Sequence, residues 1–222
     1  MAQAIGNYQD EAYQAIQRMI MRIELKPGER VNKKALEEQL SIGATPVREA
    51  ILRLRREGLL TVYPQSGTFV SKINLDEVYQ ARFVRESIEK LIVTEVIPVI
   101  TPAEIDHLRK LIALQEVYMR SRDYDNFFNL DEQFHQQFYL IAHKDFVWDW
   151  LQVVNFQFNR FRYLRLEVDD LDWQQIFDDH TAIVDAVANR QAQRAATTVE
   201  RHLHMVDDDV KVALKVHAEY FE

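Results

Sequence analysis

A mainly α-helical protein in two parts is predicted from three features of the sequence. Apolar residues recur at helical spacing along most of the chain. The one stretch that reads as β-strands, residues 59–72, is short and has a glycine at its turn. Residues 1–72 contain 11 Lys and Arg against 8 Asp and Glu, whereas the remainder contains 16 against 27. A basic part followed by an acidic part indicates two different roles.

The composition excludes several classes of protein. With 222 residues, 47% of them hydrophobic, the chain can fill a substantial core. It has no cysteine, so a metal site would have to use histidines and carboxylates. The longest apolar stretch, residues 91–100, contains Glu95 and Pro98. We therefore expect neither a signal peptide nor a membrane span, and a cytoplasmic location.

Three helices are expected before residue 58. Residues 9–24 place apolar side chains at helical spacing, and a Lys-Pro-Gly-Glu segment ends that helix. Asn32 is the expected N-cap of a second helix, which carries Leu36 and Leu40 one turn apart. Thr45 is expected to cap a third helix whose first position is Pro46.

A hairpin follows the helix stop at Gly58. Residues 59–63 and 68–72 are the expected strands, on either side of Pro-Gln-Ser-Gly. The order helix, helix, turn, helix, hairpin is that of a winged helix-turn-helix. This domain is expected to span residues 1–72.

From residue 75 onward only helical periodicity is found. The second domain, residues 75–222, is expected to be an antiparallel all-α bundle large enough to surround a cavity. Pro98 and Pro102 separate its first two helices. The expected helices are residues 75–97, 102–120, 123–142, 146–166, 172–189 and 191–217.

A winged helix-turn-helix predicts contacts with DNA. The third helix lies in the major groove in such domains, so Arg48, one turn into that helix, is the expected base reader. The start of the second helix and the hairpin tip are expected to meet phosphates or the minor groove. We expect Arg55 and Arg56 to form an ordinary solvated helix face. The further candidates are Lys33, Lys34, Thr45, Gln65, Ser66, Gly67 and Thr68.

The N-terminal segment resembles the winged-helix domain of the GntR family of bacterial transcription regulators. The resemblance covers residues 8–72 and rests on TPVREA at the third helix, EGLL at its exit and GTFV in the wing. It implies DNA contacts at Lys34, Arg48 and Gly67. The sequence departs from the family at Gly43 and Ala44, where Ser-Arg is usual, so the family's operator preference cannot be copied.

Four residues of the second part could bind a divalent metal. Asp131 and His135 stand at i and i+4 and share one helix face. With His180 and one histidine of the pair His202 and His204, they would form an incomplete five- or six-coordinate site for Zn, Ni or Mn. His204, two residues further on, faces another direction. On spacing alone, a hydrogen-bonded Asp-His pair is the commoner outcome.

Residues 75–217 are similar to the FCD ligand-binding domain of the FadR-type branch of the GntR family. The similar segments are RESIE, DEQFH, DHTAIVDAV and AATTVERHL. The resemblance implies metal ligation by Asp131, His135, His180 and His202, with Asp179 standing where Glu is common. It also implies a small organic acid or sugar acid as effector. Arg85 is the expected carboxylate partner, ahead of Arg160 and Arg162.

The expected function is a transcription regulator, a repressor released by a metabolite, that binds a palindromic double-stranded operator as a homodimer. One recognition helix covers too few base pairs to be selective alone. One alternative is a regulator that senses the metal itself. Another is a metal-dependent hydrolase with Glu132 as base, although Glu132 turns about 100° away from Asp131 on a helix.

Overall fold

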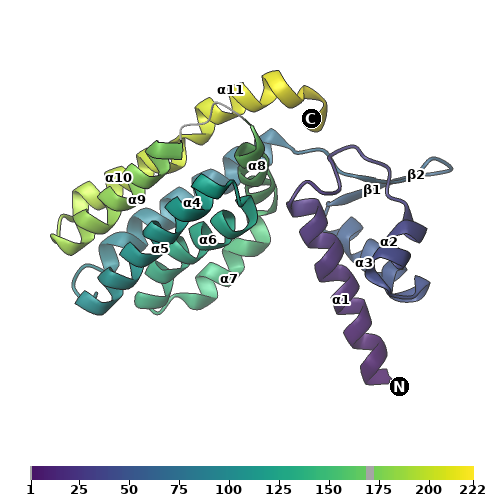
Figure 1. The fold of residues 1–222 in the computed structure, drawn as a ribbon, viewed down its shortest axis with the longest axis horizontal. Helices are drawn as coiled ribbons and strands as arrows, with labels where there is room; N and C mark the ends of the chain where they lie inside the picture. The colour runs from purple at the N-terminus through teal and green to yellow at the C-terminus, as the bar shows by residue number, and fades with distance from the viewer. Residues whose placement is uncertain (1, 169–172) are drawn as a thin grey trace. The chain divides into compact units, whose positions relative to one another are not determined.

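The computed structural model describes residues 2–168 and 173–222, with side chains from residue 8 onward (Figure 1). The chain divides into two compact units, Met1–Leu75 together with His217–Glu222, and Asp76–Val216. The predicted mainly helical fold is confirmed. The division of the chain differs from the expected one at its end. The last six residues group with the first unit and not with the helical bundle, which was expected to span residues 75–222.

The first unit begins with three helices, α1 (Ala2–Met21), α2 (Lys33–Leu40) and α3 (Ala44–Arg56). Buried side chains of α1 and α3 form its core, because the apolar residues of each helix recur on one face. Asn32 caps α2 as predicted, since its side chain accepts a hydrogen bond from the Ala35 N–H. The predicted cap of α3 is wrong: the N-cap is Gly43, and Thr45 already lies inside the helix.

The predicted hairpin is confirmed as β1 (Leu60–Tyr63) and β2 (Gly67–Val70), an antiparallel pair in which Tyr63 stands opposite Gly67. Residues 28–31 run along the other edge of β2. Val31 N–H donates to the Thr68 carbonyl at 2.8 Å, and Gly28 N–H donates to the Val70 carbonyl at 2.9 Å. The wing therefore has a third extended segment that residue spacing did not reveal.

The last six residues of the chain complete the first unit. A short turn, η1 (Ala218–Tyr220), leads to Phe221, which forms a parallel bridge with Ile73. Ile73 N–H donates to the Tyr220 carbonyl at 2.8 Å, and Glu222 N–H donates to the Ile73 carbonyl at 3.1 Å. Ile73 is 0% exposed and Phe221 is 7% exposed, so the pairing is apolar as well as hydrogen-bonded.

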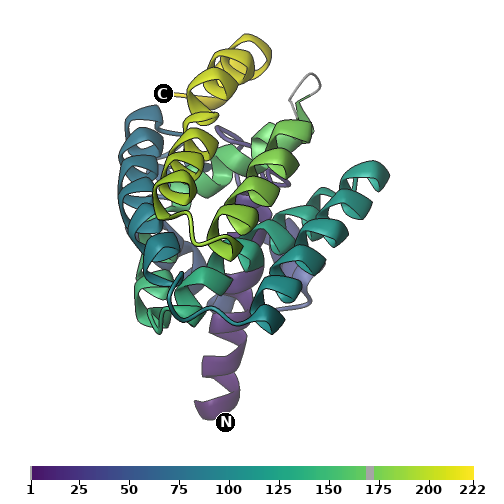
Figure 2. The ribbon, with the colours of Figure 1, turned by 90° about the vertical axis from the view of Figure 1, so that its left-hand side faces the viewer.

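The second unit is built from helices α4 to α11 (Figure 2). Short connections make α5 antiparallel to α6 and α9 antiparallel to α10, and α5 also contacts α9. Pro102 opens α5, where Thr101 and Glu104 form a capping box. The helices are α4 (Leu75–Glu95), α5 (Pro102–Ser121), α6 (Tyr124–Ile141), α7 (Asp145–Val154), α8 (Phe156–Glu167), α9 (Trp173–Ala188), α10 (Ala192–His204) and α11 (Val206–His217).

Two long predicted helices are each divided in two. The predicted helix 146–166 is interrupted at Asn155, a residue type that favours helix ends. The predicted helix 191–217 is interrupted at Met205, and three aspartates follow in the first turn of α11, where negative charge is favourable. The start of the predicted helix 172–189 lies outside the described residues. No helix in the described ranges is long and apolar enough to cross a membrane.

Candidate functional site

Side chains of three helices meet in the second unit. Asp131 and His135 lie on α6, His180 on α9 and His202 on α10. One ligand atom from each histidine lies within 4.8 Å of the others. Asp131 Oδ2 is 3.8 Å from His135 Nε2, and Asp131 Oδ1 is 3.6 Å from His180 Nε2. All four residues predicted as metal ligands therefore come together.

Two of the three imidazoles are hydrogen-bonded from behind by a polar side chain, and the third faces a carboxylate beyond hydrogen-bond distance. His135 Nδ1 is 2.9 Å from Glu89 Oε2, and His180 Nδ1 is 2.9 Å from Gln115 Oε1. His202 Nδ1 faces Asp179 Oδ2 at 3.7 Å. Such partners fix the tautomer and the ring orientation of metal-binding histidines, leaving Nε2 to act as ligand. Sequence spacing did not identify Glu89 or Gln115 in this role, because they are far from the histidines in the chain.

Burial lowers the pKa of two of the imidazoles and so favours their neutral form. His180 is 0% exposed, and burial, followed by the neighbouring His202, holds its pKa well below the usual value. Burial also lowers the pKa of His202. For Asp131, burial raises the pKa, but Arg162 and the three imidazoles lower it by more, so the group is a carboxylate. Neutral imidazoles and a carboxylate are the ligand forms that a divalent metal requires.

The donor set fits a metal ion. His135 Nε2 and His180 Nε2 are buried and have no hydrogen-bond partner among the described residues. A buried polar atom left in this way costs about 1–3 kcal/mol. A metal bound at Nε2 would satisfy both atoms.

A small cavity of about 50 Å³ opens beside Asp131 and His202. Aromatic and aliphatic side chains from α6, α8, α9 and α11 supply most of the wall. Its polar residues are Asp131, His202, Arg162, Arg165 and Asp209. Arg165 forms a close ion pair with Asp209. The wall thus combines two potential metal ligands with two guanidinium groups.

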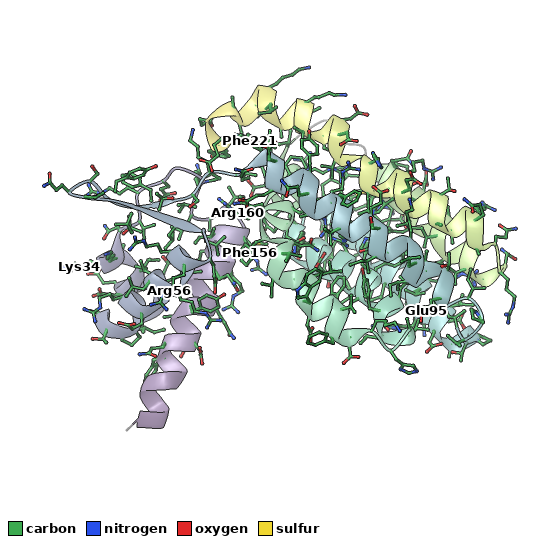
Figure 3. All side chains as sticks on the ribbon, turned by 180° about the vertical axis from the view of Figure 1, so that it is seen from behind. Lys34, Arg56, Glu95, Phe156, Arg160 and Phe221 are labelled. Atoms are coloured by element: carbon green, nitrogen blue, oxygen red, sulfur yellow. The ribbon has the colours of Figure 1, made fainter. Side chains whose placement is uncertain are left out.

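The three predicted effector-binding arginines lie in different surroundings. Arg162, on α8, lines the cavity and donates to Asp131 and Glu132. Arg85 is 1% exposed, is absent from the cavity wall, and its Nε donates to Glu89 Oε1 at 2.6 Å. Arg160, labelled in Figure 3, is 0% exposed and donates to Gln157 Oε1 at 3.2 Å. The geometry therefore favours Arg162 over Arg85, in contrast to the predicted order.

A second group of potential ligands, Glu86, Glu200 and His204, lies on α4 and α10. Lys90 Nζ is 3.4 Å from Glu86 Oε1 and 3.2 Å from Glu200 Oε2, and Arg82 also pairs with Glu86. Cationic side chains thus already neutralise these carboxylates, and the group is an ion-pair network. His204 belongs to this network and not to the three-histidine cluster, as the sequence indicated.

In the first unit, most of the predicted DNA-binding residues are accessible. Lys34 and Arg48 have side chains 84% and 67% exposed, and each pairs with a nearby glutamate on its own helix. Thr68 is an exception, because it is 4% exposed and points from β2 into the core, so its prediction as a surface contact is wrong. Gly67 is half-buried, and the remaining candidates are exposed: Lys33, Thr45, Gln65 and Ser66.

Comparison with known families accounts for both units. Residues 8–70 match the model described as bacterial regulatory proteins, gntR family, and residues 77–205 match the FCD domain. The chain belongs to the GntR family. It is a DNA-binding transcription regulator with a C-terminal FCD domain. Members of the family are regulators and not enzymes, which excludes the alternative that this chain is a metal-dependent hydrolase.

Relatives of this family match along most of their length. A transcriptional regulator from an unstable DNA locus of Streptomyces ambofaciens is 30% identical over 95% of this chain and 89% of its own. The transcriptional repressor RspR of Escherichia coli K12 is 25% identical over 95% of this chain and 92% of its own. Among solved structures, E. coli McbR/YncC has a TM-score of 0.76 at 18% identity, covering 92% of this chain and 97% of that chain, which shows a shared fold.

Proposed function

We propose that this GntR regulator is a repressor whose affinity for its operator is controlled by a small carboxylate bound beside a divalent metal. The observation that carries the proposal is the cavity wall, which brings Asp131 and His202 together with Arg162. The E. coli relative RspR, which is named a transcriptional repressor, supports the direction of control.

The metal is proposed to bind Asp131, His135, His180 and His202. The arrangement of one carboxylate and three imidazoles leaves coordination positions open for water or for oxygen atoms of a ligand. Zn, Ni and Mn all accept such ligands. When bound, the metal supplies a fixed positive charge on the cavity wall.

The carboxylate is proposed to lie between the metal and Arg162. A guanidinium group can bind a carboxylate through two parallel hydrogen bonds, and the apolar remainder of the wall suits a small carbon skeleton. Arg162 now donates to Asp131 and Glu132, so an effector would exchange these partners for its own oxygens. Arg85, which binds Glu89, is proposed to support the site indirectly through the Glu89–His135 contact.

DNA recognition is proposed to require two copies of the chain. In a helix-turn-helix, two recognition helices related by a two-fold axis read the two halves of a palindrome. Effector binding must favour one arrangement of the two winged units over another, and by linkage DNA must change effector affinity by the same factor.

The experiment compares wild type with a variant carrying His135→Ala and His202→Ala. Metal content, melting temperature and operator affinity are measured with and without the organic or sugar acid that best stabilises the wild type. We expect the variant to lack metal, to keep operator binding and to ignore the acid. The matched control carries His107→Ala and His143→Ala, because both of these histidines are exposed.

Three other results would contradict parts of the proposal. Metal retained by the double variant would show that the ligand assignment is wrong. Metal lost with a normal response to the acid would show that the effector binds elsewhere. Operator affinity in wild type that follows metal concentration, with every acid inactive, would identify a dedicated metal sensor.

A further inference from the structure

Arg30 belongs to the third extended segment of the wing. It forms an antiparallel bridge with Phe69 of β2, and its neighbours Glu29 and Val31 both hydrogen-bond to β2. The backbone at Arg30 is therefore fixed on the sheet, although the residue precedes α2 in the sequence. Residues directly opposite each other on paired strands point to the same face, so Arg30 shares a face with Phe69 and with Gly67.

The Arg30 side chain lies across the glycine at the start of β2. A Cβ atom placed on Gly67 would stand 2.9 Å from Arg30 Nε and 3.4 Å from Arg30 Nη2. Gly67 also has φ of 126°, a conformation that side-chain-bearing residues rarely adopt. Gly67 therefore allows the backbone turn, and because it has no side chain it leaves the space that the Arg30 guanidinium occupies. The guanidinium of Arg30 therefore lies beside Gly67, the residue at which β2 begins after the turn.

The charge at this position is available to a partner. Arg30 is exposed and forms no ion pair with any side chain in the described part of the protein. Two other exposed arginines of the unit are neutralised, because Arg53 pairs with Asp10 and Glu57, and Arg48 pairs with Glu49. An arginine whose backbone is fixed on the sheet and whose side chain is exposed and not neutralised is suited to bind an anionic surface.

We propose that Arg30 enters the minor groove of DNA together with the wing tip and favours A·T base pairs there. A narrow A·T minor groove has an enhanced negative potential that attracts arginine. Arginine is preferred over lysine in such a groove because a guanidinium loses its hydration more readily than an ammonium. The inference rests on the proposed placement of α3 in the major groove, which brings the wing beside the adjacent minor groove.

The test uses full-length protein and an operator selected from random duplexes with the wild type. Arg30→Ala and Arg30→Lys are compared with Arg56→Ala, an exposed arginine at the far end of α3 from Arg48. Base pairs flanking each half-site are made A·T, G·C or inosine·cytosine. Inosine lacks the amino group that guanine places in the minor groove, whereas its major-groove edge is unchanged.

Wild type should bind the A·T and inosine·cytosine flanks about tenfold more tightly than the G·C flank, the scale of one unfavourable base pair. Arg30→Ala should abolish this difference and lower the salt dependence by about one ion per half-site. Arg30→Lys should keep the salt dependence and lose most of the flank preference. Arg56→Ala should behave as wild type.

Equal flank preference in wild type and Arg30→Ala, with both proteins folded by circular dichroism, would overturn the inference. Selective loss of operator binding in Arg48→Ala would show separately that α3 reads bases. If Arg48→Ala has no effect either, the placement of the whole winged unit on DNA is wrong, and not only the role of Arg30.

Discussion

In the first unit, the side chains of Lys34 and Arg48 are 84% and 67% exposed, whereas in the second unit those of Arg85 and Glu89 are 1% and 4% exposed. Exposed charges add little to folding, because water solvates them nearly as well as a partner does. Buried charges must be matched, because an unmatched one carries its full desolvation cost. The exposed charges of the first unit are therefore available to bind DNA, whereas the buried charges of the second unit fix the geometry of a site.

The largest expected effect comes from breaking the buried network at Arg85. Arg85→Met leaves Glu89 without its guanidinium partner and weakens the contacts of Glu132. We expect the free energy of unfolding of the helical unit to fall by about 3–5 kcal/mol in urea denaturation. Adding Glu89→Leu should recover part of this loss. Arg48→Met is the exposed control, and an equal loss in both single variants would contradict the comparison.

Arg48→Ala should show the opposite behaviour. We expect operator affinity to fall by about 1–3 kcal/mol and specificity to relax at one base position in each half-site. Stability should stay within about 0.5 kcal/mol of wild type, because the side chain is exposed. Gel-shift titrations on operator variants and thermal denaturation measure the two quantities. Unchanged binding would show that α3 does not read bases through Arg48.

Tyr13 tests a polar contact inside the DNA-binding unit. Its hydroxyl donates to Glu57 Oε2 at 2.8 Å, joining α1 to the end of α3, and burial followed by Glu57 raises the Tyr13 pKa to about 12. Tyr13→Phe should lower stability by about 1 kcal/mol. In wild type, the contribution of Tyr13 is complete below pH 10 and is lost as pH rises toward 12.

Tyr8→Phe, which changes an exposed tyrosine on the same helix, is the control. Unfolding curves measured from pH 8 to pH 11.5 should converge for wild type and Tyr13→Phe at the alkaline end. Parallel curves with a constant offset over this range would mean that the Tyr13 pKa is not raised, and coincident curves would mean that the Tyr13–Glu57 contact contributes nothing to stability.

The smallest effect is expected for Lys34→Ala. If Lys34 contacts a phosphate, the substitution weakens binding to operator and random DNA alike, by less than about 1 kcal/mol. The slope of log affinity against log salt concentration should fall by roughly one per half-site. A loss confined to operator DNA would show that Lys34 reads bases.

Local signals made the first unit predictable. Asn32 is followed by a helical pattern, Gly58 marks the end of α3, and Gly67 marks the turn of the hairpin. Each end of a helix or strand is therefore indicated by residues close to it in the sequence. Thr45 was misplaced because α3 begins at Ala44, two residues earlier than predicted, without a side-chain cap. Thr68 was misplaced because alternation along β2 turns it inward, and the register of a four-residue strand is hard to read from sequence.

The metal cluster was predictable only in part. Spacing relates Asp131 to His135 on one helix, but His180 and His202 come from other helices and were identified through family resemblance. Their supporting contacts join residues far apart in sequence, such as Glu89 with His135 and Gln115 with His180. Such pairs depend on how helices pack, which helical periodicity does not specify. For the same reason, the sequence ranked Arg85 ahead of Arg162, although Arg162 lines the cavity and Arg85 does not.

The pairing of Ile73 with Phe221 has a consequence for biosynthesis. The hydrogen-bond partners of Ile73 lie in Tyr220 and Glu222, which leave the ribosome after the entire helical unit. At roughly 5–20 residues per second, the intervening chain takes about 7–30 s to translate. The DNA-binding unit can fold its helices and wing early. Its last backbone contacts form only once the FCD domain has been made, so the DNA-binding unit of a nascent chain is complete only after the helical unit exists.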